Sequence, residues 1–338
     1  MSPRRVYVVY TGGTIGMRWS PLGYRPAPGF LEQLAGEMPE LHSPDFPSCQ
    51  VNEYSPLLDS SEMTPANWVE IAGDIARNHD RYDGFVVLHG TDTLAYTASA
   101  LSFMLLGLKK PVIVTGSQLP LCEVTSDGRH NLITALLLAG KYDIPEVCVY
   151  FDGRLLRGNR TIKVSADQFG AFDSPNYPPL GRIGTRIEIR RNLLLQPIQD
   201  RLHLQEIGSA NVAALRLFPG IDASLLRNIL QPPLQGLVLE CYGVGNAPVR
   251  NLEFLGALER AYTRGVVVVD ITQCSHGSVH LGDYSTSSPL ADAGVISGHD
   301  MTAEAALAKL YYLFERKLSP DQVREEMGRS LCGELTRE

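Results

Sequence analysis

The sequence predicts an α/β protein of two domains, a larger N-terminal parallel-sheet sandwich and a smaller C-terminal α/β domain. Short apolar runs of strand length alternate with amphipathic segments of helix length, and this alternation is typical of parallel sheets. The alternation lapses once, around Ile187–Leu202, and then resumes. A chain of 338 residues is also long enough for two domains of ordinary size.

The N-terminal part contains a series of apolar runs that are expected to form strands. They are Val6–Tyr10, Val51–Leu57, Gly84–Leu88, Pro111–Thr115 and Val147–Phe151. Between the second and third runs, Thr64 is a helix N-cap and Pro65 suits the first helical position. Trp68 and Ile75 then fall on one face at helical spacing. Helices are also expected over 93–106 and 129–140.

The connection between the domains is expected where the sequence becomes rich in Arg, then in Leu and Gln, with Pro197 inside it. The predicted boundaries are 1–190 for the N-terminal domain, 191–211 for the linker and 212–338 for the C-terminal domain. Ser319 and Gln322 form a capping box that opens a last helix. The other C-terminal elements expected are strands Asn211–Leu217, Gly236–Glu240 and Gly265–Ile271 and helices near 222–230, 250–263 and 302–316.

The composition excludes several classes of protein. Hydrophobic residues make up 44% and charged residues 20%, which is typical of a folded globular chain. A net charge of −7, from 30 Lys and Arg against 37 Asp and Glu, disfavours a nucleic-acid partner. No apolar run approaches the roughly 18 residues of a membrane helix, so no membrane partner is expected. The six cysteines include no C-x-x-C pair, which indicates reduced thiols and a cytoplasmic location.

A glycine-rich turn, Thr11–Gly16, follows the first predicted strand. Its glycines allow a sharp turn and a close approach of backbone amides to a ligand. Glycines at 12, 13 and 16 lack the G-x-G-x-x-G spacing of a dinucleotide site, which counts against an NAD-dependent dehydrogenase. The following segment, Met17–Pro28, has three prolines and is expected to form a mobile flap. A simple strand-ending turn is the alternative interpretation.

Two further strand ends carry hydroxyl and carboxylate side chains, in Leu57–Ser61 and His89–Thr93. Helix capping or turn formation would also explain Asp59 and Asp92. However, ligands of open parallel sheets bind beyond the carboxyl ends of the strands. The three strand ends together therefore favour a small polar ligand that carries an ammonium group and an amide or carboxylate.

A threonine hydroxyl in this cluster needs a base before it can act as a nucleophile. Lys163 is the candidate base, although a lone lysine is more often an exposed surface charge; a basic role requires a lowered pKa. Cys274, His276 and His280 have the residue types of a zinc site. The glycine and serine between them argue against a rigid helical ligand pair, so neither a metal nor a cofactor is expected.

The motifs Thr11–Gly16 and His89–Thr93, in this order and each after a strand, resemble the bacterial-type asparaginase/glutaminase family, in particular its cytoplasmic type I members. The similarity extends to Tyr242–Pro248 and Gly298–Ala306, so it covers nearly the whole chain. The resemblance implies the fold of that family, with a flavodoxin-like C-terminal domain. It also implies L-asparagine amidohydrolase activity, which yields L-aspartate and ammonia without a cofactor.

The resemblance implies catalytic roles for a small group of residues. Thr14 would attack the side-chain amide carbon of the substrate and form a β-acyl-enzyme. Thr91, Asp92 and Lys163 would form a triad in which Lys163 draws a proton through Thr91. Tyr24 matches the lid tyrosine of the family, which closes over the bound amino acid.

The resemblance also implies how the substrate is bound. Asp92 would hold the α-ammonium group, and Asp59, Ser60 and Ser61 would hold the rest of the α-amino-acid end. Backbone amides near Thr91 and Ser117 are the expected oxyanion donors. The family forms homotetramers as dimers of dimers, in which Asn246 and Tyr284 would reach the site of the neighbouring subunit.

Type I members can also bind asparagine at a separate activating site. Thr272, Gln273 and Cys274 match that site, but Glu240 replaces an expected arginine and Ile162 replaces a threonine. Because a carboxylate repels the carboxylate of an effector, activation by asparagine is expected to be weak or absent.

Two other functions remain open from the sequence. An ammonia-releasing amidotransferase subunit shares the fold and motifs, although the acidic net charge disfavours its tRNA partner. A non-catalytic amino-acid-binding module would retain Asp92 and Ser60 but would need neither Thr14 nor Lys163. Selectivity between asparagine and glutamine depends on pocket depth, which the motifs do not determine.

Overall fold

A computed structural model describes residues 4–196, 201–281 and 288–336. The chain divides into two compact units, Met1–Gln205 and Glu206–Glu338. Each unit is α/β with its own sheet, so the predicted fold class is confirmed. The division falls inside the segment 191–211, although the predicted domain boundaries themselves stay a prediction.

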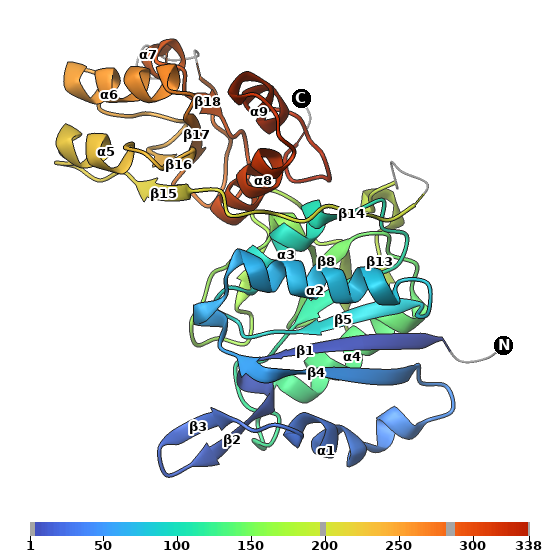
Figure 1. Cartoon of the computed structure of the whole chain (residues 1–338). Coiled ribbons are helices and arrows are strands. Elements are labelled where there is room, and N and C mark those ends of the chain that lie inside the picture. The colour runs from blue at the N-terminus through green and yellow to red at the C-terminus, as the bar shows by residue number, and fades with distance from the viewer. Residues whose placement is uncertain (1–3, 197–200, 282–287, 337–338) are drawn as a thin grey trace. The chain divides into compact units, whose positions relative to one another are not determined.

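The first unit is built on a mixed sheet, which has eight strands within the described residues (Figure 1). In spatial order they are β13 (Ile187–Ile189), β12 (Gly181–Ile183), β9 (Arg154–Arg157), β8 (Val147–Phe151), β7 (Val112–Thr115), β5 (Gly84–Leu88), β1 (Arg5–Gly12) and β4 (Ser48–Leu58). The strands from β8 to β4 are parallel, whereas β9, β12 and β13 join as antiparallel neighbours. The parallel strands are the predicted ones, and the antiparallel extension was not predicted.

Helices cover both faces of this sheet. The main ones are α2 (Pro65–Asn78), α3 (Leu94–Met104) and α4 (Gly128–Lys141), and α4 lies on the opposite face from α2 and α3 (Figure 1). Thr64 forms the predicted N-cap of α2, in a capping box with Asn67. The helix predicted over 93–106 stops earlier, because Leu105 and Leu106 form β6, which pairs with β14 (His203–Leu204).

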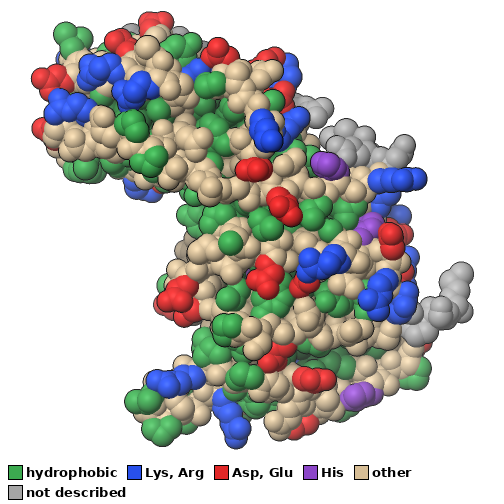
Figure 2. Space-filling model, viewed as in Figure 1, with side chains coloured by type: hydrophobic (Ala, Val, Ile, Leu, Met, Phe, Trp, Pro, Cys, Tyr) green, Lys and Arg blue, Asp and Glu red, His purple; other side chains and the backbone are tan. Residues whose placement is uncertain are grey.

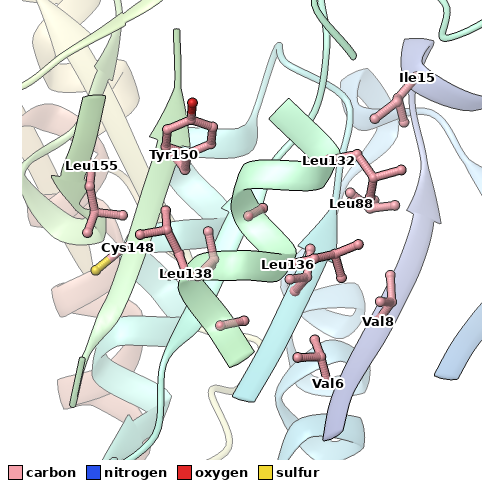
Figure 3. Packing of buried hydrophobic residues seen from close by; sticks show 14 of the residues in the cluster. Val6, Val8, Ile15, Leu88, Leu132, Leu136, Leu138, Cys148, Tyr150 and Leu155 are labelled. Atoms are coloured by element: carbon pink, nitrogen blue, oxygen red, sulfur yellow. The ribbon is translucent and has the colours of Figure 1, made fainter. Parts of the chain in front are cut away.

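A hydrophobic core lies between α4 and the sheet. Val6 and Val8 point to the same face of β1 and are at most 2% exposed. Figure 3 shows Leu132 and Leu136 of α4 pointing toward Val8 and Leu88. Burial of each such side chain stabilises the folded state by roughly 1.5–3 kcal/mol. The packed core therefore holds in place the strand ends that carry the polar motifs.

The segment Met17–Pro28, predicted to be a mobile flap, contains a β-hairpin that was not predicted. Strands β2 (Met17–Ser20) and β3 (Gly23–Pro26) pair antiparallel, with Trp19 opposite Tyr24. Alternation of side chains across so short a pair gives only a weak sequence signal. The short helix α1 (Phe30–Gly36), which follows the hairpin, and the pair β10 (Ile162–Lys163) and β11 (Phe172–Asp173) were not predicted either.

The second unit contains a parallel sheet in the order β15-β16-β17-β18. Its strands are β15 (Val212–Arg216), β16 (Gly236–Cys241), β17 (Val267–Thr272) and β18 (Ile296–Ser297). Its helices are α5 (Ala223–Ile229), α6 (Leu252–Thr263), α7 (Ser288–Asp292), α8 (Ala303–Glu315) and α9 (Pro320–Met327). The capping box of Ser319 and Gln322 opens α9 as predicted, whereas β18 and α7 were not predicted. In the described part of both units, no helix is long and apolar enough to cross a bilayer.

Candidate active site

The turn that carries Thr14 is shaped by two glycines after β1. Gly12 and Gly13 have φ values of 135° and 91°, a region that disfavours residues with a side chain. Thr14 then begins a single 3₁₀ turn that ends at Gly16. A Cβ atom on Gly13 would lie 2.5 Å from the backbone nitrogen of Gly90, so the two motifs touch through their backbones.

The loop after β4 also lies against the His89–Thr93 motif. A Cβ atom on Gly90 would lie 2.4 Å from Ser60 Oγ, and Thr93 Oγ1 donates a 2.6 Å hydrogen bond to the carbonyl of Ser60. Asp59 accepts 2.9 Å hydrogen bonds from the backbone nitrogen and the hydroxyl of Ser61. The structure therefore brings the three predicted strand ends together at one edge of the sheet.

Lys163 lies beside the pair Thr91 and Asp92. Its Nζ donates hydrogen bonds of 2.9 Å to Thr91 Oγ1 and 2.7 Å to Asp92 Oδ1. Thr91 is 8% exposed, whereas the side chain of Asp92 is 65% exposed and open to a ligand from solvent. The position of Lys163 is set by β10, whose pairing with β11 holds the lysine opposite Phe172. Lys163 is therefore not a lone surface charge.

His89 has a structural position in this site. It is fully buried, and its ring contacts the carbonyl of Gly90 at 2.7 Å and Thr97 Oγ1 at 2.9 Å. Burial lowers the pKa of His89 to about 4, so the ring is neutral near pH 7. Trp68 Nε1 donates to Thr97 at 3.0 Å and extends this network into α2. The network fixes the backbone next to Thr91.

Ser117 follows β7 on the adjacent loop. Its hydroxyl donates a 2.5 Å hydrogen bond to the carbonyl of Leu119. A Cβ atom on Gly116, the residue before it, would lie 2.3 Å from the carbonyl oxygen of His89. Asp127 was missed by the sequence reasoning, yet its carboxylate accepts hydrogen bonds from the backbone nitrogens of Gln118 and Leu119 at 3.0–3.1 Å. An aspartate two residues before the predicted helix 129–140 is the signal that could have identified it.

Tyr24 lies on the β2–β3 hairpin. It is 41% exposed, and its hydroxyl donates a 2.6 Å hydrogen bond to Glu123 Oε1. The hydrogen bond to this carboxylate raises the pKa of Tyr24, because it stabilises the neutral phenol. The sequence reasoning identified Tyr24 but not Glu123.

The remaining candidate residues belong to the second unit. Asn246 lies in the turn after β16, where its backbone nitrogen donates to the carbonyl of Tyr242 at 2.7 Å. Tyr284 lies outside the described residues. Within those that are described, no cluster of three His, Cys, Asp or Glu side chains could hold a metal ion.

The candidate effector residues also lie in this unit, apart from Ile162 in β10. Glu240 Oε2 lies 3.3 Å from Nη1 of Arg216, the residue opposite it on β15. Thr272 donates to the carbonyl of Gly243 at 2.5 Å and accepts from the backbone nitrogen of Cys274 at 3.0 Å. Gln273 donates to the carbonyl of Glu240 at 2.8 Å, so these side chains fix the strand ends around Glu240.

Comparison with known proteins matches both units. Residues 5–195 match the family domain described as "Asparaginase, N-terminal", and residues 211–327 match the "Glutaminase/Asparaginase C-terminal domain". The L-asparaginase 1 of Escherichia coli K12 is 51% identical over 339 residues, which cover 99% of each chain. The crystal structure of L-asparaginase I from Vibrio cholerae is 50% identical and covers 99% of this chain and 100% of that chain, with a TM-score of 0.92.

A third relative carries a different name. The human protein named 60 kDa lysophospholipase is 45% identical over 357 residues, which cover 98% of this chain and 62% of the human protein. The residues matched by the first family domain include both the glycine turn and the His89–Thr93 motif. This chain therefore belongs to the asparaginase/glutaminase family over both of its units and is similar to the type I L-asparaginases over its whole length.

Proposed function

We propose that this protein is an L-asparagine amidohydrolase that converts L-asparagine to L-aspartate and ammonia with a threonine nucleophile. The contact of Lys163 with Thr91 and Asp92, at the sheet edge that also carries Thr14, is the observation that supports the proposal most directly. A binding module needs no amine held 2.9 Å from a buried hydroxyl. Similarity to L-asparaginase 1 and L-asparaginase I supports asparagine as the substrate.

The first half of the reaction would release ammonia. Thr14 Oγ attacks the carbon of the substrate amide, its proton passes to the leaving nitrogen, and the C–N bond breaks to give ammonia and a β-acyl-enzyme. Backbone amides near Thr91 and Ser117 would stabilise the oxyanion, each at about 2.7–4 kcal/mol. These amides lie on adjacent loops whose backbones are in direct contact, which supports their pairing.

The second half would use water. When Lys163 is neutral, its Nζ can accept the proton of Thr91 while that hydroxyl takes a proton from the attacking water. The ester bond to Thr14 then breaks, the proton that Lys163 accepted returns to Thr14 Oγ, and L-aspartate leaves. Asp92 is paired with Lys163 yet widely exposed, which suits an additional role as the acceptor for the α-ammonium group. Ser60, Ser61 and Asp59 would hold the α-carboxylate end through their hydroxyls and turn amides.

The oligomeric state, the cellular location and the effector site are proposed from the resemblance to the family. We propose a homotetramer, assembled as a dimer of dimers, in which Asn246 and Tyr284 reach the neighbouring site, and a cytoplasmic location. Thr272, Gln273, Cys274 and Glu240 would be the counterpart of the effector site.

Ammonia release from L-asparagine and L-glutamine tests the catalytic assignment. Thr14→Ala and Lys163→Met should each lower kcat by about 100-fold or more, since the first removes the nucleophile and the second removes the group that accepts the proton of Thr91. Thr91→Val, which keeps the shape of Thr91 but removes its hydroxyl, should act like Lys163→Met. The control is Thr263→Val, an exposed helix residue whose hydroxyl donates a 2.9 Å hydrogen bond to the carbonyl of Glu259 in its own helix.

Three outcomes would reject the proposal. Full activity in Thr14→Ala would show that another group is the nucleophile. No ammonia from either amide with the unsubstituted protein, combined with saturable binding of asparagine, would favour the amino-acid-binding module. Ammonia release that requires an added glutamyl-tRNA partner would favour the amidotransferase subunit.

A further inference from the structure

The β2–β3 hairpin exposes most of its large apolar side chains. Trp19 is 65%, Leu22 is 75% and Tyr24 is 41% exposed, and Figure 2 shows hydrophobic side chains gathered on this projection. Trp19 packs edge-on against Tyr24 with ring centroids 5.5 Å apart. A segment with so little burial has low local stability, so its position depends on a few specific contacts.

Three successive residues of the loop after β7 provide such contacts. Leu121 donates its backbone N–H to the carbonyl of Ile15 at 3.0 Å, and Cys122 Sγ lies 3.7 Å from the carbonyl oxygen of Met17. Glu123 accepts the hydrogen bond from Tyr24. We call the segment Leu121–Glu123 the docking strip. It contacts the Thr14–Gly16 turn, the first strand of the hairpin and the second strand in that order.

The docking strip is itself held firmly. Asp127 binds the backbone nitrogens of Gln118 and Leu119, and Ser126 Oγ donates to the carbonyl of Leu119 at 3.0 Å. The backbone nitrogen of Glu123 donates a 2.9 Å hydrogen bond to the carbonyl oxygen of Pro120, which closes a turn. The docking strip is therefore continuous with the fixed loop that carries Ser117. The hairpin is thus held by the same loop that contributes Ser117 to the candidate active site.

Glu123 makes the strongest of the three contacts. A hydrogen bond of 2.6 Å to a carboxylate is charge-assisted, and such bonds are about twice as strong as neutral ones. The contact of Cys122 is long and involves a weak thiol donor. Glu123 is also the docking-strip residue whose side chain reaches an aromatic ring of the hairpin.

We infer that Glu123 is a positioning residue that holds Tyr24, and with it the β2–β3 hairpin, against the turn that carries Thr14. The functional consequence rests on the proposed function, in which Tyr24 closes over the bound amino acid. Because Glu123 acts on the lid rather than on the reacting atoms, its loss should weaken substrate capture more than the chemical step.

Acrylamide quenching of tryptophan fluorescence measures the hairpin without substrate. The sequence has two tryptophans, of which Trp68 is 7% exposed and shielded, so quenching reports mainly Trp19. Glu123→Ala should increase quenching and speed tryptic cleavage after Arg18 in the hairpin. In the ammonia assay it should raise KM about 3- to 10-fold, as expected for one charge-assisted hydrogen bond at the surface, and change kcat less than about twofold.

Two further variants make the test specific. Glu123→Gln keeps a carbonyl oxygen that can accept the hydrogen bond from Tyr24. Its quenching, cleavage rate and KM should therefore be close to those of the unsubstituted protein. Glu70→Ala, at an exposed glutamate of α2 that no contact among the described residues joins to the hairpin, should behave like the unsubstituted protein.

The results separate this inference from the proposed function. If Glu123→Ala matches the unsubstituted protein in quenching and cleavage, or if Glu123→Gln behaves like Glu123→Ala, the positioning role is wrong. If the quenching and cleavage pattern appears but no variant releases ammonia, the positioning role stands and the proposed hydrolysis fails.

Discussion

At the scale of single residues, Asp270 is a carboxyl group in an environment that opposes its charge. It is fully buried in β17, and no N–H or O–H group of a described residue donates to either of its oxygens. A Cβ atom on Gly245 would lie 2.8 Å from Asp270 Oδ2, so the carboxyl lies directly under the turn before Asn246. Burial raises the pKa of Asp270 to about 7, and the neighbouring Cys241 thiol offsets only part of that shift.

This shift predicts how stability depends on pH. An aspartate has a pKa of about 3.9 when unfolded, so the folded state binds more protons than the unfolded state between about pH 4 and pH 7. Stability is therefore lost as pH rises through that window, by up to about 4 kcal/mol. Asp270→Asn should remove this loss, so its free energy of unfolding relative to the natural protein should increase from pH 4 to pH 8. Urea denaturation across this range measures the difference; a constant difference would contradict the prediction.

At the scale of elements, the candidate active site depends on how closely the ends of β1 and β5 approach each other. The turn after β1 and the turn after β5 are in backbone contact at Gly13 and Gly90, without room for a side chain. The parallel pairing of β1 with β5 sets this approach, and buried apolar residues on both strands maintain it. Thr14 and Thr91 each follow one of these glycines, so their separation is determined by strand register rather than by loop conformation.

Gly13→Ala tests this dependence. Its Cβ would lie 2.5 Å from Gly90 N, so the turns must separate, and displacement of about 1 Å at a reacting group can cost about 100-fold in rate. Gly220→Ala is a matched control, because Gly220 has the same φ of 91° but nothing within 4 Å of its Cβ position. We expect Gly13→Ala to lower kcat about 100-fold and Gly220→Ala to leave it near the natural value. Equal kcat losses in both variants would assign the effect to backbone strain instead.

At the scale of the whole molecule, the chain consists of two units with separate hydrophobic cores. One core includes Val8, Leu88 and Leu136, and the other includes Leu239, Phe254 and Val268. The candidate catalytic residues lie in the first unit, whereas most candidate effector residues lie in the second. Any activation by asparagine would therefore be a coupling between sites on different units.

The charges around Glu240 predict that this coupling is weak. Arg216 is paired with Glu240, and burial, with a smaller contribution from Glu240, raises the pKa of Glu304 to about 7. Because Arg216 is already paired with Glu240, it is less able to hold the carboxylate of an effector. The rate against asparagine concentration should be hyperbolic, with a Hill coefficient of about 1. A sigmoidal curve that becomes hyperbolic after Cys274→Ala would contradict the prediction.

The sequence by itself determined the parallel strands β1, β4, β5, β7 and β8, most helices and the polar residues at the strand ends. Hydrophobic periodicity and capping are local signals, and they specify an element wherever neighbouring residues agree. Thr14, Ser60 and Thr91 could be assigned to one edge because parallel strands all end on the same side of a sheet.

Only the tertiary structure decided the contacts between distant segments. Lys163 reaches Thr91 across a separation of 72 residues, and Glu123 reaches Tyr24 across 99. The hairpin, the antiparallel strands β9, β12 and β13, and the role of Asp127 depend in the same way on partners that no local pattern specifies. Short strands and exposed carboxylates have little intrinsic preference, so packing and hydrogen bonding in the folded chain determine where they lie.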